Sequence, residues 1–162
     1  MSNLPNSVNT KKRDGLKLML REFPAKHHLT LATHQPQINL LSATKKVKQW
    51  YHHMSRRLFG RHYRDLPADQ RIEFLLLPEG GLANLHFHGL IRVPQTHQDY
   101  FERIALYRWR RVAHKGTLHF APIGPTTEDR ERWFTYITKG TLAIEILHSS
   151  MLIDPDDKPE SR

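Results

Sequence analysis

Two histidines separated by one residue, His86 and His88, lie in the segment NLHFHGLIRV, residues 84–93, which otherwise has the composition of a β-strand. Successive side chains of a strand point to opposite faces, so both imidazoles project from one face with Cα atoms about 6.6 Å apart. Imidazoles in this arrangement can bind one metal ion. The alternative is a chance pair of solvated rings, because the chain carries 12 histidines.

A carboxylate can join the two histidines if this strand is half of a hairpin. Residues 71–77 also have the composition of a strand, and glycine and asparagine between the two segments are typical of a turn. A register that pairs Glu79 with His86 also pairs Glu73 with Arg92, which is a favourable cross-strand charge pair. One register therefore predicts both pairings.

This register predicts a site of two histidines and one carboxylate, formed by Glu79, His86 and His88, with Glu73 as the alternative carboxylate. The chain has no cysteine, so thiolate ligands and disulfides are excluded. The opposite face of the hairpin is expected to supply apolar core residues, namely Phe74, Leu76, Phe87 and Ile91.

A second candidate for chemistry is a tyrosine near the end of a predicted helix that Gly140 closes. Arg132, Tyr136 and Lys139 follow at spacings of four and three, so they share one helix face. A tyrosine hydroxyl is scarcely ionised at neutral pH and becomes a nucleophile only where cations or hydrogen bonds favour the phenolate. Arg132 and Lys139 are such cations. The alternative is an ordinary helix-end tyrosine with its hydroxyl in water.

The charge balance favours a polyanionic partner. Lysine and arginine number 25 against 16 aspartate and glutamate, which gives a net charge of +9 and an isoelectric point near 10.0. Residues 43–64 contain no acid. We expect DNA contacts from this region and from Arg132; a solvated basic face is the alternative. The expected contact residues are Lys45, Lys46, Lys48, Arg56, Arg57 and Arg132.

The length of 162 residues suits one domain with a real core. No stretch has the length and apolar character of a membrane span, and the first 14 residues lack the apolar core of a signal peptide. The sequence therefore predicts a soluble, cytoplasmic protein with no membrane partner.

Periodicity and turn residues predict the order of the elements. Residues 15–23 fit a strand and a helix equally well. We expect a flexible basic arm over 1–14, a folded domain over 15–148 and a flexible tail over 149–162. Within the domain, strands are expected at 28–34, 71–77, 84–93 and 117–122 with a further one at 141–148, and helices at 43–59 (capped by Ser42), 97–113 (capped by Thr96) and 126–139.

This order predicts an α+β fold of the ferredoxin-like or RRM-like kind, in which an antiparallel sheet carries helices on one face. Phe87 and Ile91 would pack under the helices. His86 and His88 would then point to the other face of the sheet, which is expected to be open to a ligand and to have a basic rim.

The motifs together resemble those of a known family. HFHGLI at 86–91 with upstream Glu79, and YITK at 136–139, resemble the second and third motifs of the HUH endonucleases, specifically the single-tyrosine rolling-circle replication initiators. LTLATH at 29–34 stands where their first motif lies. The resemblance covers roughly residues 28–140.

The resemblance implies that His86, His88 and Glu79 bind Mg²⁺ or Mn²⁺, that Tyr136 is the nucleophile and that Lys139 assists it. It also implies the HUH nuclease fold and the nicking of single-stranded DNA at a replication origin. The products would be a 5′-phosphotyrosine and a free 3′-OH, and reversal would rejoin strands. Two imidazoles favour Mn²⁺ or another transition ion over Mg²⁺ in tightness of binding.

Two departures narrow this expectation. No second tyrosine lies three or four residues from Tyr136, which argues against the two-tyrosine initiators. No Gly-rich phosphate loop with Lys-Ser/Thr is present, so unwinding is expected to require a separate helicase.

Two other classes of protein fit the same sequence. A single-tyrosine HUH transposase has similar size and chemistry, whereas in mobilisation relaxases the tyrosine usually lies near the N-terminus. A non-catalytic single-stranded RNA or DNA binder would use the same fold but would stack bases on sheet aromatics and ignore metal.

Overall fold

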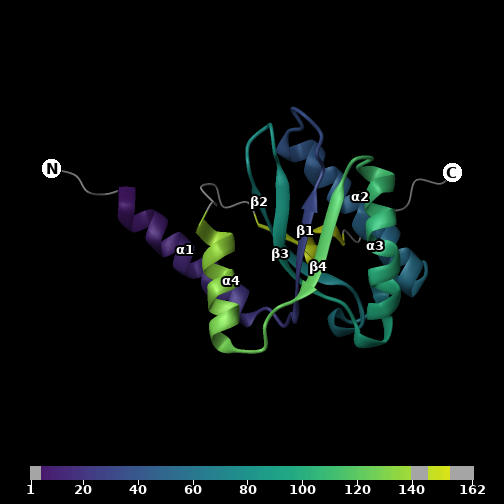
Figure 1. Ribbon diagram of the computed structural model, residues 1–162. Helices are drawn as coiled ribbons and strands as arrows, with labels where there is room; N and C mark the ends of the chain where they lie inside the picture. The colour runs from purple at the N-terminus through teal and green to yellow at the C-terminus, as the bar shows by residue number, and fades with distance from the viewer. Residues whose placement is uncertain (1–4, 140–145, 154–162) are drawn as a thin grey trace.

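The computed structural model describes residues 5–139 and 146–153, with side chains from Thr10 to Thr138 and from Ile146 to Ile153. Five strands form one sheet that lies between two pairs of helices (Figure 1). The elements in chain order are α1 (Pro5–Glu22), β1 (His27–Ala32), α2 (Leu40–Phe59), β2 (Glu73–Glu79), β3 (His86–Arg92), α3 (Gln98–Val112), β4 (Thr117–Pro122), α4 (Thr127–Lys139) and β5 (Leu147–His148), with short 3-10 helices at Tyr63–Asp65, Ala68–Gln70, Gln95–His97 and Ser149–Leu152.

The sheet is antiparallel throughout, with the strand order β4-β1-β3-β2-β5. The expected hairpin register is confirmed, because Glu73 is opposite Arg92 and Glu79 is opposite His86. Arg92 Nη2 lies 2.5 Å from Glu73 Oε2, so Glu73 is already paired with a cation. The ferredoxin-like α+β fold predicted from the element order is confirmed.

Helices α2 and α3 cover one face of the sheet and enclose the larger apolar core. Phe74, Leu76, Phe87 and Ile91 point into it, as the register predicts. The indole of Trp50 on α2 donates a hydrogen bond to the Ala105 carbonyl on α3. That of Trp109 on α3 donates to the Ala32 carbonyl on β1. These bonds tie the two helices to each other and to the sheet.

The N-terminus of α2 differs from the prediction. The helix begins at Leu40 and its N-cap is Asn39, whose side chain accepts a hydrogen bond from the Ser42 backbone N–H at 2.8 Å. Ser42 therefore donates to the cap rather than serving as the cap. The Thr96 cap expected for the next helix is also wrong, since Thr96 lies in the short 3-10 helix that precedes α3.

The other sheet face is not left open along its whole length, as the sequence suggested. Leu75, Leu77 and Leu90 on this face form a second apolar cluster with residues of α1 and α4. A pair between Arg21 Nε and Glu131 Oε1, 2.5 Å apart, joins the two helices. Only part of this face is therefore free to receive a ligand.

The N-terminal segment is a helix rather than the flexible arm that the sequence predicted. Residues 5–14, expected as a flexible arm, are helical, and the ambiguous residues that follow continue the same helix. Leu16 and Leu20, one turn apart, are buried, whereas Leu18 is 52% exposed. The packing of this stripe against α4 and the sheet decides between the two periodicities that the segment fits.

The C-terminal part is described only in pieces. Residues 140–145 and 154–162 lie outside the described residues, so part of the strand expected at 141–148 and most of the expected tail cannot be compared. Residues Leu147–His148 do pair with β2. Leu152 is buried within Ser149–Leu152, so this part of the expected flexible tail is packed. No helix in the described ranges is both long and apolar enough to cross a membrane.

Candidate metal centre and its tyrosine

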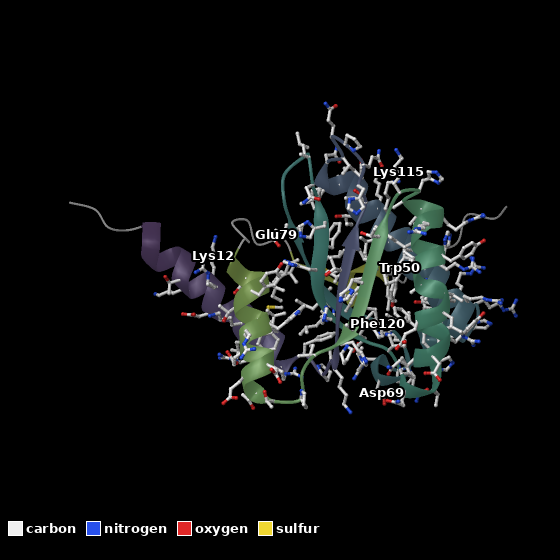
Figure 2. All side chains as sticks on the ribbon, viewed as in Figure 1. Lys12, Trp50, Asp69, Glu79, Lys115 and Phe120 are labelled. Atoms are coloured by element: carbon white, nitrogen blue, oxygen red, sulfur yellow. The ribbon has the colours of Figure 1, made fainter. Side chains whose placement is uncertain are left out.

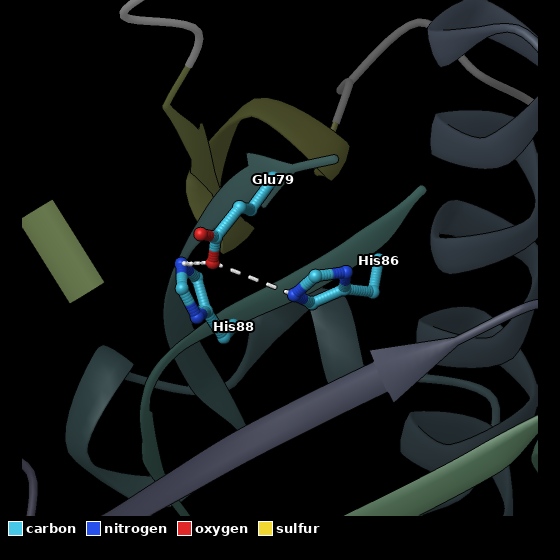
Figure 3. A group of neighbouring side chains, drawn as sticks. All are labelled: Glu79, His86 and His88. Carbon is cyan, nitrogen blue, oxygen red and sulfur yellow. Dashed lines mark ion pairs between the residues drawn. The ribbon is translucent and has the colours of Figure 1, made fainter. Parts of the chain in front are cut away.

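Three side chains at the end of the β2–β3 hairpin form a group that could hold a metal ion. One ligand atom each from Glu79, His86 and His88 lies within 4.8 Å of the others. Glu79 Oε2 is 3.4 Å from His86 Nε2 and 3.2 Å from His88 Nε2 (Figure 3). The hairpin register produces this arrangement, because all three residues point to the same face of the sheet.

His88 has the features of a metal-ligating imidazole. Its side chain is 4% exposed, and its buried Nε2 makes no hydrogen bond to the described residues, although Glu79 Oε2 lies 3.2 Å away. The pKa of His88 lies below that of an ordinary histidine, chiefly because burial disfavours the charged ring. His86 also lowers this pKa, whereas Glu79 and a hydrogen bond with the Ile137 backbone raise it. A neutral imidazole oriented through one nitrogen presents the other as a ligand.

His86 is oriented in the same manner. Its Nδ1 lies 3.0 Å from the backbone carbonyl of Asn84, which can accept the ring proton and leave Nε2 directed at Glu79. The turn that supplies this carbonyl depends on Gly80, which has a φ of 88°, in the left-handed region that favours glycine. The donor set of two imidazoles and one carboxylate fits a divalent cation such as Mn²⁺.

Tyr136 reaches this group from a different element. It lies on α4 with its side chain 69% exposed, and its ring centroid is 6.3 Å from that of His88. On the other side of α4, Phe134 and Ile137 are buried in the second apolar cluster. The packing of these two residues therefore directs Tyr136 toward the metal-binding group.

Of the two cations expected on this helix face, the structure describes the side chain of Arg132. Arg132 is exposed one turn before Tyr136. Lys139 is the last residue of α4, and its side chain lies outside the described residues.

The basic residues of α2 are not brought to the metal group. They lie on the helix that covers the opposite face of the sheet, so the expected basic rim around the histidines is not formed by α2. Lys46 Nζ donates a hydrogen bond to the Val112 carbonyl at 2.7 Å, and Arg57 Nε donates to the Tyr100 hydroxyl at 2.6 Å. Lys45, Lys48 and Arg56 line a cavity on the outer side of α2.

A group of rings beside the metal-binding residues was not predicted from the sequence. The ring of His28 lies 5.1 Å from that of His119 and 5.3 Å from that of Trp133, measured between centroids. The register places His28 beside Leu90, two residues from His88 and on the same face. The alternation of strand 27–32 was a signal for His28, but the position of Trp133 depends on how α4 packs.

No protein-family model and no curated protein matches the chain. Among solved structures, the crystal structure of the hypothetical protein ORF119 from Sulfolobus islandicus rod-shaped virus 1 is similar, with 12% sequence identity and a TM-score of 0.47. The match covers 85% of this chain and 97% of that chain. The fold and the site by themselves define a ferredoxin-like α+β protein with a group of two histidines and a glutamate that could bind metal.

Proposed function

We propose that this protein is a metal-dependent endonuclease of the HUH type, which nicks single-stranded DNA at a replication origin through Tyr136. The observation that carries the proposal is the contact between the rings of Tyr136 and His88, which come from α4 and β3. Tyr136, which is 69% exposed, therefore lies next to a group of side chains that could bind a metal ion. This combination accords with the resemblance of HFHGLI and YITK to the motifs of single-tyrosine initiators.

The reaction is a transesterification. Tyr136 Oη forms a bond to phosphorus as the bond from phosphorus to the 3′ oxygen breaks, and the electron pair stays on that oxygen. The phenolic proton is lost and the 3′ oxygen gains a proton, so the products are a 5′-phosphotyrosine and a free 3′-OH. A divalent cation at Glu79, His86 and His88, either Mg²⁺ or Mn²⁺, would supply a Lewis acid beside the phosphate.

The protein's own residues have separate roles in this scheme. Glu79 and the two histidines would hold the cation that offsets the charge of the scissile phosphate, and Arg132 is available to a neighbouring phosphate because it lies one turn from Tyr136. Lys139 assists the tyrosine. Because the phosphotyrosine retains the energy of the phosphodiester, a 3′-OH that returns to the site can rejoin the strand. Unwinding of the origin falls to a separate helicase.

A non-catalytic binder of single strands is the second candidate. The rings of His28, His119 and Trp133 on the metal-bearing face could stack with unpaired bases. Such a binder would act without metal and would tolerate the loss of Tyr136. A single-tyrosine HUH transposase is the alternative within the nuclease class.

The test is incubation with single-stranded oligonucleotides tiled across the genetic element that encodes the protein, with Mn²⁺ or with EDTA, followed by a denaturing gel and mass spectrometry. We expect a covalent adduct only with metal and only on Tyr136. If the protein binds the same strands but forms no adduct either with Mn²⁺ or with EDTA, the nuclease proposal is wrong and the non-catalytic binder is favoured.

A further inference from the structure

The outer side of α2 carries a large basic cavity that the cleavage reaction does not use. Its volume is about 660 Å³, and it lies between α2 and the segment that follows Gly60. Cationic and histidine side chains dominate its lining, which includes Lys45, Lys48, His52, Arg56, Arg61 and Arg64.

A second basic groove continues from this cavity between α2 and α3. Its volume is about 460 Å³, and every described residue that lines it is arginine or histidine. His53 and Arg56 line both spaces, so the two form one surface, which we call the α2–α3 basic cleft. The groove is lined by His53, Arg56, Arg57, Arg108 and Arg111.

Among the residues that the structure describes, neither lining contains a carboxylate, so no described lining residue neutralises the positive charge of the cleft. Arg56, Arg108 and Arg111 all lower the pKa of His53, after the larger effect of burial. Arg108 Nε is buried without a hydrogen-bond partner. One acid is close, since Asp65 Oδ2 lies 3.5 Å from His62 Nδ1. Cations gathered in this way repel one another unless an anionic ligand lies among them.

The cleft and the metal group lie on opposite sides of the sheet. Figure 1 shows α2 and α3 on one side of the sheet and α1 and α4 on the other. Phe87 points toward α2 and α3, whereas His86 and His88 point to the other face. A strand whose phosphate lies at Tyr136 therefore does not contact the cleft at the same nucleotide. The cleft requires a ligand of its own or a distant part of the same nucleic acid.

The lining favours phosphates over unpaired bases. Single-stranded binders combine cations with open aromatic rings on which bases stack. Here the tyrosine in the lining, Tyr63, is 2% exposed and its hydroxyl is bonded to His52. Two tyrosines lie near the cleft but are named in neither lining, and both rings already have an arginine over them: Arg57 and Arg103 over Tyr100, and Arg108 over the exposed Tyr107. A lining of lysine and arginine that offers no aromatic ring for bases to stack on is typical of contacts to the phosphate backbone of a duplex.

We propose that the α2–α3 basic cleft is a second nucleic-acid site, which binds the phosphate backbone of double-stranded DNA independently of its sequence. This site is separate from the metal centre and does not depend on the cleavage reaction. Duplex bound at the cleft would hold the protein on DNA while an unpaired segment reaches the opposite face of the sheet.

The experiment measures binding of a fluorescent 20-base-pair duplex by anisotropy at several salt concentrations. The test variant is Arg56→Glu/Arg111→Glu, in which both altered side chains are exposed. The control is Lys11→Glu/Lys12→Glu, which changes the net charge equally on α1. Figure 1 shows α1 across the sheet from α2 and α3, and Figure 2 labels Lys12 on it. We expect at least a tenfold loss of affinity and a shallower salt dependence in the test variant, and less than a twofold loss in the control.

Two further measurements complete the test. Arg56→Gln/Arg111→Gln removes charge without reversing it and should weaken duplex binding in the same direction, while thermal unfolding checks that both cleft variants fold. Equal losses in the cleft and control variants would show that affinity follows net charge alone and would overturn the proposal. A duplex affinity that is insensitive to salt, or a single strand that competes equally well at the cleft, would overturn it as well.

Discussion

The ring of Tyr136 on α4 lies at 66° to the ring of His88 on β3, with the two centroids 6.3 Å apart. The backbone of Ile137, the next residue of α4, also hydrogen-bonds to His88. One helix thus both presents the tyrosine and orients a ligand of the candidate metal group. A change in how α4 packs would alter both functions together.

Replacement of Tyr136 by Phe should abolish the covalent adduct and leave binding of single-stranded DNA nearly unchanged, because only the hydroxyl is removed from an exposed ring. The measurement is adduct formation on a denaturing gel beside anisotropy with the same oligonucleotide. Tyr107→Phe is the matched control, since Tyr107 is 59% exposed on α3. An adduct that persists in Tyr136→Phe would exclude this residue as the nucleophile.

Replacement of His86 by Ala should weaken Mn²⁺ binding at least tenfold, because one of three ligands is lost. Calorimetric titration measures the affinity directly. In the unaltered protein, Mn²⁺ should also raise the melting temperature, since an ion that binds only the folded state stabilises it. His114→Ala removes an exposed histidine and should leave both readouts unchanged. Equal Mn²⁺ affinity in the two variants would show that His86 is not a metal ligand.

Replacement of Asn39 by Ala should reduce the free energy of unfolding by about 1 kcal/mol, because the cap of α2 is lost. Ser42→Ala is the informative control. Since only the backbone N–H of Ser42 takes part in the cap, this change should cost less than about 0.5 kcal/mol. Urea denaturation measures both values, and a larger loss for Ser42→Ala would restore the cap that the sequence suggested.

Replacement of Gly89 by Ala should destabilise the protein by about 1–3 kcal/mol, because the added carbon overpacks the sheet. A Cβ at this position would collide with the Leu75 carbonyl and lie 2.8 Å from Leu76 Cα. At Gly81 a Cβ would meet nothing within 4 Å, so Gly81→Ala should be nearly neutral. Equal denaturation midpoints for the two variants would show that β2 and β3 separate more easily than the structure indicates.

The protein should lose stability as the pH falls below about 6.5. Burial is the largest cause that lowers the pKa values of His27, His28, His53 and His148 in the folded state. The unfolded chain then binds more protons than the folded chain, so the free energy of unfolding decreases from pH 6.5 downward until the folded-state pKa values are reached.

Urea denaturation at pH 7.5 and 5.5 measures this dependence. His53→Gln should reduce the difference in stability between the two pH values, because it removes a group whose pKa is lowered by burial in the folded state. His114→Gln, at an exposed position, serves as the control. Stability that does not change between these pH values would contradict the prediction.

The sequence by itself determined the hairpin and the three residues of the metal group. The period of two along a strand puts His86 and His88 on one face, and the pairing of Glu73 with Arg92 selects the register that brings Glu79 to them. These features depend on neighbours in one hairpin, so local pattern was sufficient. The order of the larger elements likewise predicted the ferredoxin-like sheet.

Only the tertiary structure decided which elements share each face of the sheet. Leu16 and Leu20 fit two periodicities, and burial against α4 and the sheet selects the helix. The same packing brings Tyr136 to His88, because Phe134 and Ile137 insert beside Leu75 and Leu90. Contacts between residues far apart in the chain depend on how apolar surfaces fit in three dimensions, and a pattern of residue types along one segment does not contain that information.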